Sequence, residues 1–457
     1  MLVRRIRKIY NYPLTNAFSK CIFAAESKHK LMKLPKTLFL ILLCFTLQFC
    51  FADTIRMMQY NLMYYTTSSP SGCNTSGNYM NEKDKNLKTI INYTLPDVFC
   101  VNEIGSQNTW IDRLLNNVLN ADGRDYYART PLTNFSGNGI SSIANMLYYD
   151  SRKLAFHSYF YVTTSVRDIN AYKMYYKSSS LAQGDTAFIT FAIAHLKAGD
   201  TDTDRNTRKT QVERLTTRLE REGIDNYVFS GDFNLKRASE PAYQHLLFNN
   251  NTAFRFLDPI NEYGDWYRNS RFAKIHTQST HTASGNCFAG GGLDDRFDFI
   301  LVSPTLFYGT KKVKVLPETY HALGQDGLRL RGSLLSPANH SLPAEILQAM
   351  YDFSDHLPVI CYFEMNITTK VNEYSPAFFV NIENPVKNEL SLQIFAENDQ
   401  IFKFEIYSIT GKQIDSFTEH ISAGNNNLSR RFDFAPSFYI LKISNEQRET
   451  VIKKLIK

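Results

Sequence analysis

Short apolar runs of β-type residues recur between residues 54 and 365 and alternate with polar or amphipathic stretches. Such alternation is typical of a layered α/β domain, in which strands build the inner sheets and helices cover them. The strand candidates are TIRMMQYNLMYY, DVFCVNEI, NMLYYD, TAFITFAIAHL, YVFSGDF, RFDFILVS and LPVICYFEM. Between the fourth and fifth runs, Val212, Leu215 and Leu219 recur at helical spacing before Gly223, which predicts an amphipathic helix.

Residues 1–52 have the layout of a secretory signal peptide. Lys33 and Lys36 precede the apolar run LFLILLCFTLQFCFA, and cleavage is predicted after Ala52. This run is shorter than the roughly 20 residues that a membrane-spanning helix needs. Met1 and Met32 are both candidate start residues.

The basic charge of the chain is concentrated in this N-terminal segment. Residues 1–52 contain nine Lys or Arg and one acidic residue, a charge of +8, whereas the whole chain carries +7. The remainder is therefore close to neutral, which gives no electrostatic support for a polyanionic substrate. Any affinity for phosphate has to be local or provided by a metal ion.

The last part of the chain has a different pattern. After a polar connection that includes Pro376, the runs NELSLQIFA, IFKFEIYSI, KQIDSF, FYILKIS and RETVIKKLIK are separated by turn signals. About 80 residues of this kind predict a small β-sandwich. We therefore divide the chain into an N-terminal extension with signal peptide (1–52), a catalytic domain (53–367), a linker (368–380) and a C-terminal domain (381–457).

Four cysteines remain beyond residue 52. Cys100 and Cys361 lie in apolar, strand-like runs, which predicts buried thiols. Cys73 and Cys287 lie in Gly/Ser-rich loops, and the sequence does not decide whether they form a disulfide.

Polar residues that suit phosphoester chemistry stand at the ends of the predicted strands, where α/β sheets place their sites. Hydrolysis of a phosphoester needs a hard cation, a positioned water and a proton donor for the leaving oxygen. Carboxylates and amides are suitable oxygen ligands for Mg²⁺. The candidates, in chain order, are Asn61, Glu103, His195, Asp232, Asn234, Asp298, Asp355 and His356.

Each of these residues alone has an ordinary explanation as a turn or hydrogen-bonded residue, but their order is specific. The series QYNL, NEIG, HLKAG, GDFN, RFDFILVS and SDHLPV resembles the endonuclease/exonuclease/phosphatase family over roughly residues 54–365. This family includes deoxyribonucleases, abasic-site endonucleases, inositol polyphosphate 5-phosphatases and bacterial sphingomyelinases. The resemblance implies a four-layer αββα sandwich that hydrolyses phosphoesters with Mg²⁺, or with Mn²⁺ as a substitute.

The resemblance also implies roles for the motif residues. Glu103 would be the principal Mg²⁺ ligand, with Asn61 and Asp355 close to the same ion or a second one. Asp232 would orient or activate the attacking water. Asn234 would donate a hydrogen bond to the scissile phosphate.

Two histidines complete the implied machinery. His356, supported by Asp298, would stabilise the phosphate or act as acid or base, because a carboxylate behind an imidazole fixes its tautomer and raises its basicity. His195 would protonate the leaving oxygen. Deoxyribonuclease-like members orient this histidine with a Glu, but the matching strand here, residues 143–149, has no carboxylate. Asn145 or a tyrosine would have to substitute, or His195 mainly binds phosphate.

Two other segments are secondary candidates. His276 and His281 lie in a Thr/Ser/Gly-rich stretch that we expect to be a solvated loop bordering the site. Residues 305–352 form an insert long enough for a lid or a substrate-recognition flap, in which Arg329 and Arg331 are either phosphate contacts or surface charges.

The C-terminal domain resembles the sorting domain of the type IX secretion system of Bacteroidetes. The matching features are Asn384-Pro385, the IYSITGKQI turn, the FYILKIS strand and the Lys-rich end KKLIK. The resemblance implies export through the outer-membrane secretion machinery and a secreted or cell-surface location. A carbohydrate-binding sandwich competes with this interpretation, but the scarcity of Trp argues against a sugar platform.

We therefore predict a secreted, monomeric Mg²⁺-dependent phosphodiesterase, foremost a nuclease acting on extracellular DNA or RNA. A sphingomyelinase-like phosphodiesterase acting on a phospholipid headgroup is the first alternative. The second is a surface protein that binds without catalysis, which the complete set of candidate residues argues against.

Overall fold

The computed structural model describes residues 53–67, 79–133, 141–179, 181–184, 186–365, 378–382, 385–396, 398–447 and 449–457. The predicted signal peptide and most of the predicted linker lie outside these ranges. No helix in the described ranges is long and apolar enough to cross a membrane.

Residues 53–365 form two mixed β-sheets. The six-stranded sheet has the order β10 (Val313–Ala322), β11 (Val359–Met365), β1 (Asp53–Tyr65), β2 (Val98–Gly105), β4 (Ile143–Asp150) and β3 (Tyr127–Arg129). The five-stranded sheet has the order β5 (Leu154–Val162), β6 (Ile169–Tyr176), β7 (Phe188–His195), β8 (Tyr227–Asp232) and β9 (Asp298–Val302). Each sheet has one parallel pair, β1 with β2 and β7 with β8.

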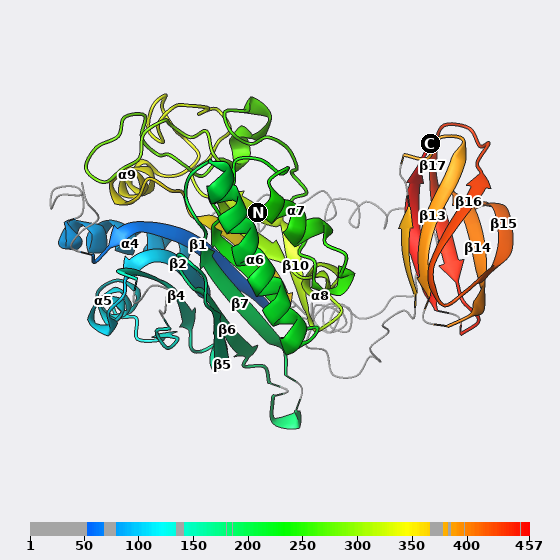
Figure 1. Ribbon diagram of the computed structural model, residues 1–457, viewed down its shortest axis with the longest axis horizontal. Coiled ribbons are helices and arrows are strands. Elements are labelled where there is room, and N and C mark those ends of the chain that lie inside the picture. Colours follow the sequence, from blue (N-terminus) through cyan, green and yellow to red (C-terminus); the bar gives the residue numbers. More distant parts are fainter. Residues whose placement is uncertain are drawn as a thin grey trace, which may run out of the picture. The chain divides into compact units, whose positions relative to one another are not determined.

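Three hydrophobic cores define four layers. The middle core joins side chains of both sheets, such as Cys100 of β2 and Phe191 of β7. An outer core packs α4 (Met80–Thr94), α5 (Asn108–Leu114) and α9 (Ala344–Phe353) on the six-stranded sheet. The third core packs α6 (Asp202–Glu222) and α7 (Pro241–Phe248) on the five-stranded sheet. The predicted αββα sandwich is therefore confirmed, with its helices outside the sheets (Figure 1).

The predicted amphipathic helix is α6. It begins with a capping box, in which the Thr201 hydroxyl accepts from the backbone of Asp204 and the Asp204 carboxylate accepts from that of Thr201. Its residues Val212, Leu215 and Leu219 are buried in the core beneath the helix. Shorter helical segments are α8 (Pro304–Tyr308), a π turn (Leu115–Leu119) and 3₁₀ turns at Leu181–Gln183, Thr252–Phe254 and Ser270–Ile275.

The insert at 305–352, whose role the sequence left open, contributes a strand and a helix to the sandwich. β10 pairs with β11 at the edge of the six-stranded sheet, and α9 packs on the outer core. Arg329 is buried and bonds to the Asp326 carboxylate and two backbone carbonyl groups. It therefore holds its own loop together instead of presenting a charge to phosphate.

The C-terminal part forms the predicted β-sandwich. A three-stranded sheet contains β12 (Phe378–Ile382), β13 (Glu389–Ala396) and β16 (Gly424–Arg431). A four-stranded sheet contains β15 (Gln413–Ile421), β14 (Gln400–Ser408), β17 (Phe438–Ser444) and β18 (Thr450–Ile456). Alternate residues of these strands, for example Leu390, Leu392, Phe402 and Phe404, form a core of their own. The exact domain boundaries stay predictions.

Candidate functional site

Both sheets contribute to one polar site. Asn61 and Glu103 come from β1 and β2 of the six-stranded sheet. His195 and Asp232 end the parallel strands β7 and β8, and Asp298 begins β9, which runs antiparallel to β8. In the sheet register His195 pairs with Asp232, and Asp232 pairs with Asp298, so three residues from distant parts of the chain lie in one row.

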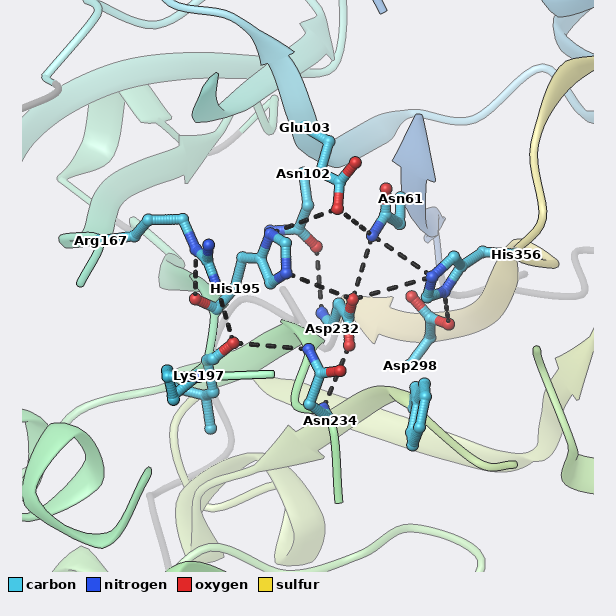
Figure 2. A network of polar contacts seen from close by, with 12 residues as sticks. Asn61, Asn102, Glu103, Arg167, His195, Lys197, Asp232, Asn234, Asp298 and His356 are labelled. Carbon is cyan, nitrogen blue, oxygen red and sulfur yellow. Dashed lines mark hydrogen bonds and ion pairs between the residues drawn. The ribbon is translucent and has the colours of Figure 1, made fainter. Parts of the chain in front are cut away.

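The amide of Asn61 lies at the centre of the site (Figure 2). Its Nδ2 donates to Glu103 Oε1 (3.1 Å) and to Asp232 Oδ2 (3.0 Å), and it lies 3.4 Å from His356 Nε2. Its Oδ1 accepts from the backbone N–H of Met63 (3.0 Å). This arrangement offers a donor to the carboxylates, so metal ligation through Oδ1 would require the amide to rotate. The predicted role of Asn61 as a metal ligand stays a prediction.

Three buried side chains form a group with metal-ligand spacing. Glu103, His195 and Asp232 each place one ligand atom within 4.8 Å of the others. His195 lies between the two carboxylates, with Nδ1 3.6 Å from Glu103 Oε1 and Nε2 3.5 Å from Asp232 Oδ2. Of the two predicted carboxylate ligands, Glu103 belongs to this group and Asp355 does not, while Asn61 bonds to two of its members.

Asp355 lies at the edge of the site and is held by a neighbouring loop. Its Oδ2 accepts from Gln278 Nε2 (3.2 Å) and from the backbone N–H of Ala289 (3.0 Å). Gln278 Nε2 also lies 2.8 Å from His356 Nε2. Gln278 therefore joins the carboxylate and the imidazole of the SDH motif.

His356 and Asp298 form the predicted buried pair. His356 Nδ1 lies 2.7 Å from Asp298 Oδ2, and Asp298 is fully buried. Burial lowers the pKa of His356, but Asp298, Asp232 and Asp355 together hold that pKa well above its ordinary value. The pair thus orients the imidazole and favours its charged form.

The other ionisable groups are crowded in an environment that disfavours charge. Burial raises the pKa of Asp232 to about 7. The pKa of Glu103 is also raised, mainly by burial and to a lesser degree by repulsion from Asp355. Burial, together with the charges of Arg167 and His356, lowers the pKa of His195 well below its ordinary value. Carboxylates collected in this way would be stabilised by a divalent cation.

The GDFN turn places its polar residues by backbone geometry. Phe233 is buried and stacks with Phe229 and Phe299, while Asn234 has a φ of 53° and its backbone N–H donates to Asp232 Oδ1 (3.1 Å). A Cβ at Gly231 would lie 1.8 Å from the carbonyl oxygen of Ala194. The glycine therefore allows the close approach of β7 to β8.

Asn102 is a structural residue of the site that the sequence did not single out. Its Oδ1 accepts from Gln59 Nε2 (2.7 Å) and from the backbone N–H of Asp232 (3.0 Å). Its Nδ2 donates to Asn145 Oδ1 (2.7 Å) and to the carbonyl of Ala194 (3.1 Å). Its position beside Glu103 in the NEIG motif was a usable signal.

Arg167 is a second residue that sequence reasoning missed, and no motif pointed to it. It lies in the connection between β5 and β6, and its guanidinium donates to the carbonyls of His195 (2.9 Å) and Leu196 (2.8 Å). The missing glutamate of residues 143–149 is not replaced by Asn145, which donates to Asn170 Oδ1 (2.9 Å) instead.

The loop with His276 and His281 differs from the expected solvated loop. His276 is fully buried and bonds to the carbonyl of Trp266 (2.7 Å). The ring of His281 stacks against the rings of Phe288 and Tyr351. Cys287 is in a disulfide, and Cys73, whose pairing the sequence left undecided, lies outside the described residues. Cys100 and Cys361 are the predicted buried free thiols.

Comparisons with known proteins address the two parts of the chain separately. Residues 384–457 match the family model described as "Secretion system C-terminal sorting domain", which confirms that resemblance. A comparison with curated proteins finds no match.

Solved structures resemble the larger part. The catalytic domain of human Nocturnin is 15% identical, covers 69% of this chain and 97% of its own, and has a TM-score of 0.42. An endonuclease/exonuclease/phosphatase family protein from Bacteroides thetaiotaomicron is 13% identical, with 69% and 98% coverage and a TM-score of 0.41. D. rerio TDP2 complexed with single strand DNA product is 12% identical, with 68% and 100% coverage and a TM-score of 0.41. At these values the likeness supports no conclusion about activity.

Proposed function

We propose that residues 53–365 form a Mg²⁺-dependent phosphodiesterase that hydrolyses extracellular nucleic acid. The observation that carries this proposal is the convergence of Glu103, His195 and Asp232 within 4.8 Å beside the His356–Asp298 pair. Such a group combines hard oxygen donors with two imidazoles, which suits the hydrolysis of a phosphoester.

The donor set fits a hard divalent cation. Glu103 and Asp232 would hold the ion through carboxylate oxygens, with His195 or Asp355 beside it. When bound, Mg²⁺ would neutralise charge that develops on the phosphate, and Mn²⁺ would substitute for it. The raised pKa values of Glu103 and Asp232 support this assignment, because a cation would relieve the unfavourable burial of both carboxylates.

The polar groups around the ion, including those that would hold it, would also act on the water and the substrate. Asp232 would orient the attacking water, and Asn234 would donate to the phosphate from the turn after β8. His356, fixed by Asp298 on one ring nitrogen, would present Nε2 to the phosphate or to a transferred proton. His195 would donate to the leaving oxygen or bind phosphate.

The C-terminal domain would direct the protein out of the cell. Its match to a secretion sorting domain supports export through the outer-membrane machinery and a secreted or surface location. We further propose that the signal peptide is removed after Ala52 and that the exported protein acts as a monomer.

The first test measures hydrolysis of bis-p-nitrophenyl phosphate by the chain from Asp53 to its C-terminus. We expect activity with Mg²⁺ or Mn²⁺, and its loss with EDTA and in Glu103→Gln. Glu82→Gln, at an exposed position on α4, is the matched control and should keep its activity. Metal-independent hydrolysis, or none with any divalent ion, would refute the proposal.

The second test compares plasmid DNA, RNA and sphingomyelin vesicles as substrates. Cleavage of DNA or RNA is expected. Cleavage of sphingomyelin alone would replace the nuclease with the lipid-headgroup phosphodiesterase, and binding without any cleavage would favour the non-catalytic alternative.

A further inference from the structure

Three stacked aromatic rings lie beside the candidate site. The ring of His281 packs against Tyr351 of α9 with a centroid distance of 3.8 Å and against Phe288 with a distance of 4.0 Å. Both ring pairs are inclined by only 25°. Tyr351, His281 and Phe288 therefore form a column of nearly parallel rings, which we call the aromatic column.

Backbone hydrogen bonds attach this column to Asp355. The N–H of Ala289, the residue after Phe288, donates to Asp355 Oδ2 (3.0 Å). The N–H of Thr280, the residue before His281, donates to the carbonyl oxygen of Asp355 (3.0 Å). Two of the three rings are thus adjacent in sequence to groups that bond a residue of the phosphate site.

The loop that presents Phe288 is constrained. Phe288 and Gly285 exchange two backbone hydrogen bonds, of 2.9 Å and 3.2 Å. Cys287 is disulfide-bonded, and Asn286 and Cys287 both have left-handed backbone angles, with φ of 51° and 78°. Non-glycine residues in this conformation are uncommon and concentrate where a loop serves a ligand. A ring held in place loses little entropy when it binds a partner.

The column has an anchored end and an outward end. Tyr351 packs against the core beneath α9. Phe288 is partly exposed, and in the described part of the chain it belongs neither to a hydrophobic core nor to the residues packed against one. A large apolar ring is therefore partly accessible in the loop that bonds Asp355 at the edge of the candidate site.

We infer that Phe288 is a stacking platform for an unpaired nucleobase of the strand whose phosphate occupies the site. This inference rests on the proposed function and specifies a single-stranded or locally unpaired nucleic acid as its substrate. Parallel rings extend naturally by one more planar ring, and base stacking on aromatic side chains is tolerant of sequence. A choline headgroup would instead be enclosed by several ring faces directed at one cation, whereas these rings use their faces on one another.

The kinetic test compares two substrates of equal length, a thymidine oligonucleotide and an abasic analogue with the same phosphates. Phe288→Leu keeps an apolar side chain without a plane, and Phe288→Trp keeps the plane. Stacking on one aromatic side chain changes affinity by about 5- to 150-fold. We expect the ratio of kcat/KM on thymidine to kcat/KM on the abasic analogue to fall at least about fivefold in Phe288→Leu and to be retained in Phe288→Trp. An unchanged ratio in Phe288→Leu would overturn the inference.

A binding test separates failure of this inference from failure of the proposed function. In Phe288→Trp, with EDTA present, we expect tryptophan fluorescence to be quenched by the thymidine oligonucleotide and not by the abasic analogue. Quenching without hydrolysis under any metal condition would support the platform and refute the phosphodiesterase. Hydrolysis of DNA without selective quenching would refute the platform alone. Quenching only by sphingomyelin vesicles would replace the nucleobase with a lipid headgroup.

Discussion

Substitution of Asn102 tests whether the two sheets are joined as the structure describes. Its side-chain amide is fully buried and makes four hydrogen bonds, two as acceptor and two as donor. In Asn102→Ala the partners on Gln59, Asp232, Asn145 and Ala194 all lose this bond inside the protein. A typical buried hydrogen bond contributes about 1 kcal/mol net, and an unsatisfied partner costs about 1–3 kcal/mol. We therefore expect a loss of about 4 kcal/mol in the free energy of unfolding, less where a partner finds water.

The assay is urea denaturation followed by tryptophan fluorescence. The chain has only two tryptophans, Trp110 and Trp266, and both lie in the αββα sandwich, so the signal reports this part alone. Asn117→Ala is the matched control, because Asn117 is exposed and, among the described residues, its side chain bonds to Asp84 alone (3.3 Å). It should cost no more than about 0.5 kcal/mol.

A second variant examines the direction of these bonds. In Asn102→Asp the size is kept, but a carboxylate cannot donate to Asn145 Oδ1 or to the Ala194 carbonyl. We expect it to be at least as destabilising as Asn102→Ala. A loss below about 1 kcal/mol in both variants, equal to an ordinary surface substitution, would refute the four-bond arrangement.

Three further predictions concern charge and metal. Asp298→Asn keeps a hydrogen-bonding group on His356 but removes its charge, so kcat on bis-p-nitrophenyl phosphate should fall by about 10- to 150-fold, and an unchanged kcat would contradict the assigned pair. Burial raises the pKa of the Asp295 carboxyl to about 7. The folded state therefore holds a proton that the unfolded state releases above about pH 4. The free energy of unfolding should consequently fall as pH rises from about 4 to 7. At pH 8 Asp295→Asn should therefore have a higher Tm than the parent, and its free energy of unfolding should be larger by up to a few kcal/mol. The two proteins should differ little at pH 4, and equal Tm values at pH 8 would contradict this prediction. Mg²⁺ should raise the Tm of the parent by several degrees and that of Glu103→Gln by less, as measured by tryptophan fluorescence, and an equal rise in both would remove Glu103 from the metal site.

Several features of the fold were predictable because their signals are local. The helix α6 follows from residues spaced three and four apart and from its terminal glycine, all within one segment. Strands such as β8 can be predicted because their sequence is an apolar run that ends in polar residues. In contrast, β5 was missed because it is an edge strand with several exposed residues, and His157 and Ser158 interrupt its apolar residues.

The insert at 305–352 shows a different limit. Its length suggested a lid, but part of it forms β10, which pairs with β11 at the edge of the six-stranded sheet. Whether a segment can pair there depends on which strand of the sheet has an unpaired edge, and the residues of the insert do not specify this. Arg329 likewise looked like an available cation, although the structure bonds it to its own loop. The identity of a charged residue does not reveal which groups accept its hydrogen bonds in the folded protein.

The sequence by itself determined the set of candidate residues for the chemistry, because carboxylates, amides and histidines at strand ends are visible one segment at a time. Tertiary structure alone decided how they combine. Asn61 and His356 are 295 positions apart, and Asp232 and Asn102 are 130 apart, yet each pair is in contact. Only the packing of two sheets against each other brings such residues together, and it also placed Arg167 and Gln278 beside them. Those contacts depend on the whole fold, so no local pattern could have specified them.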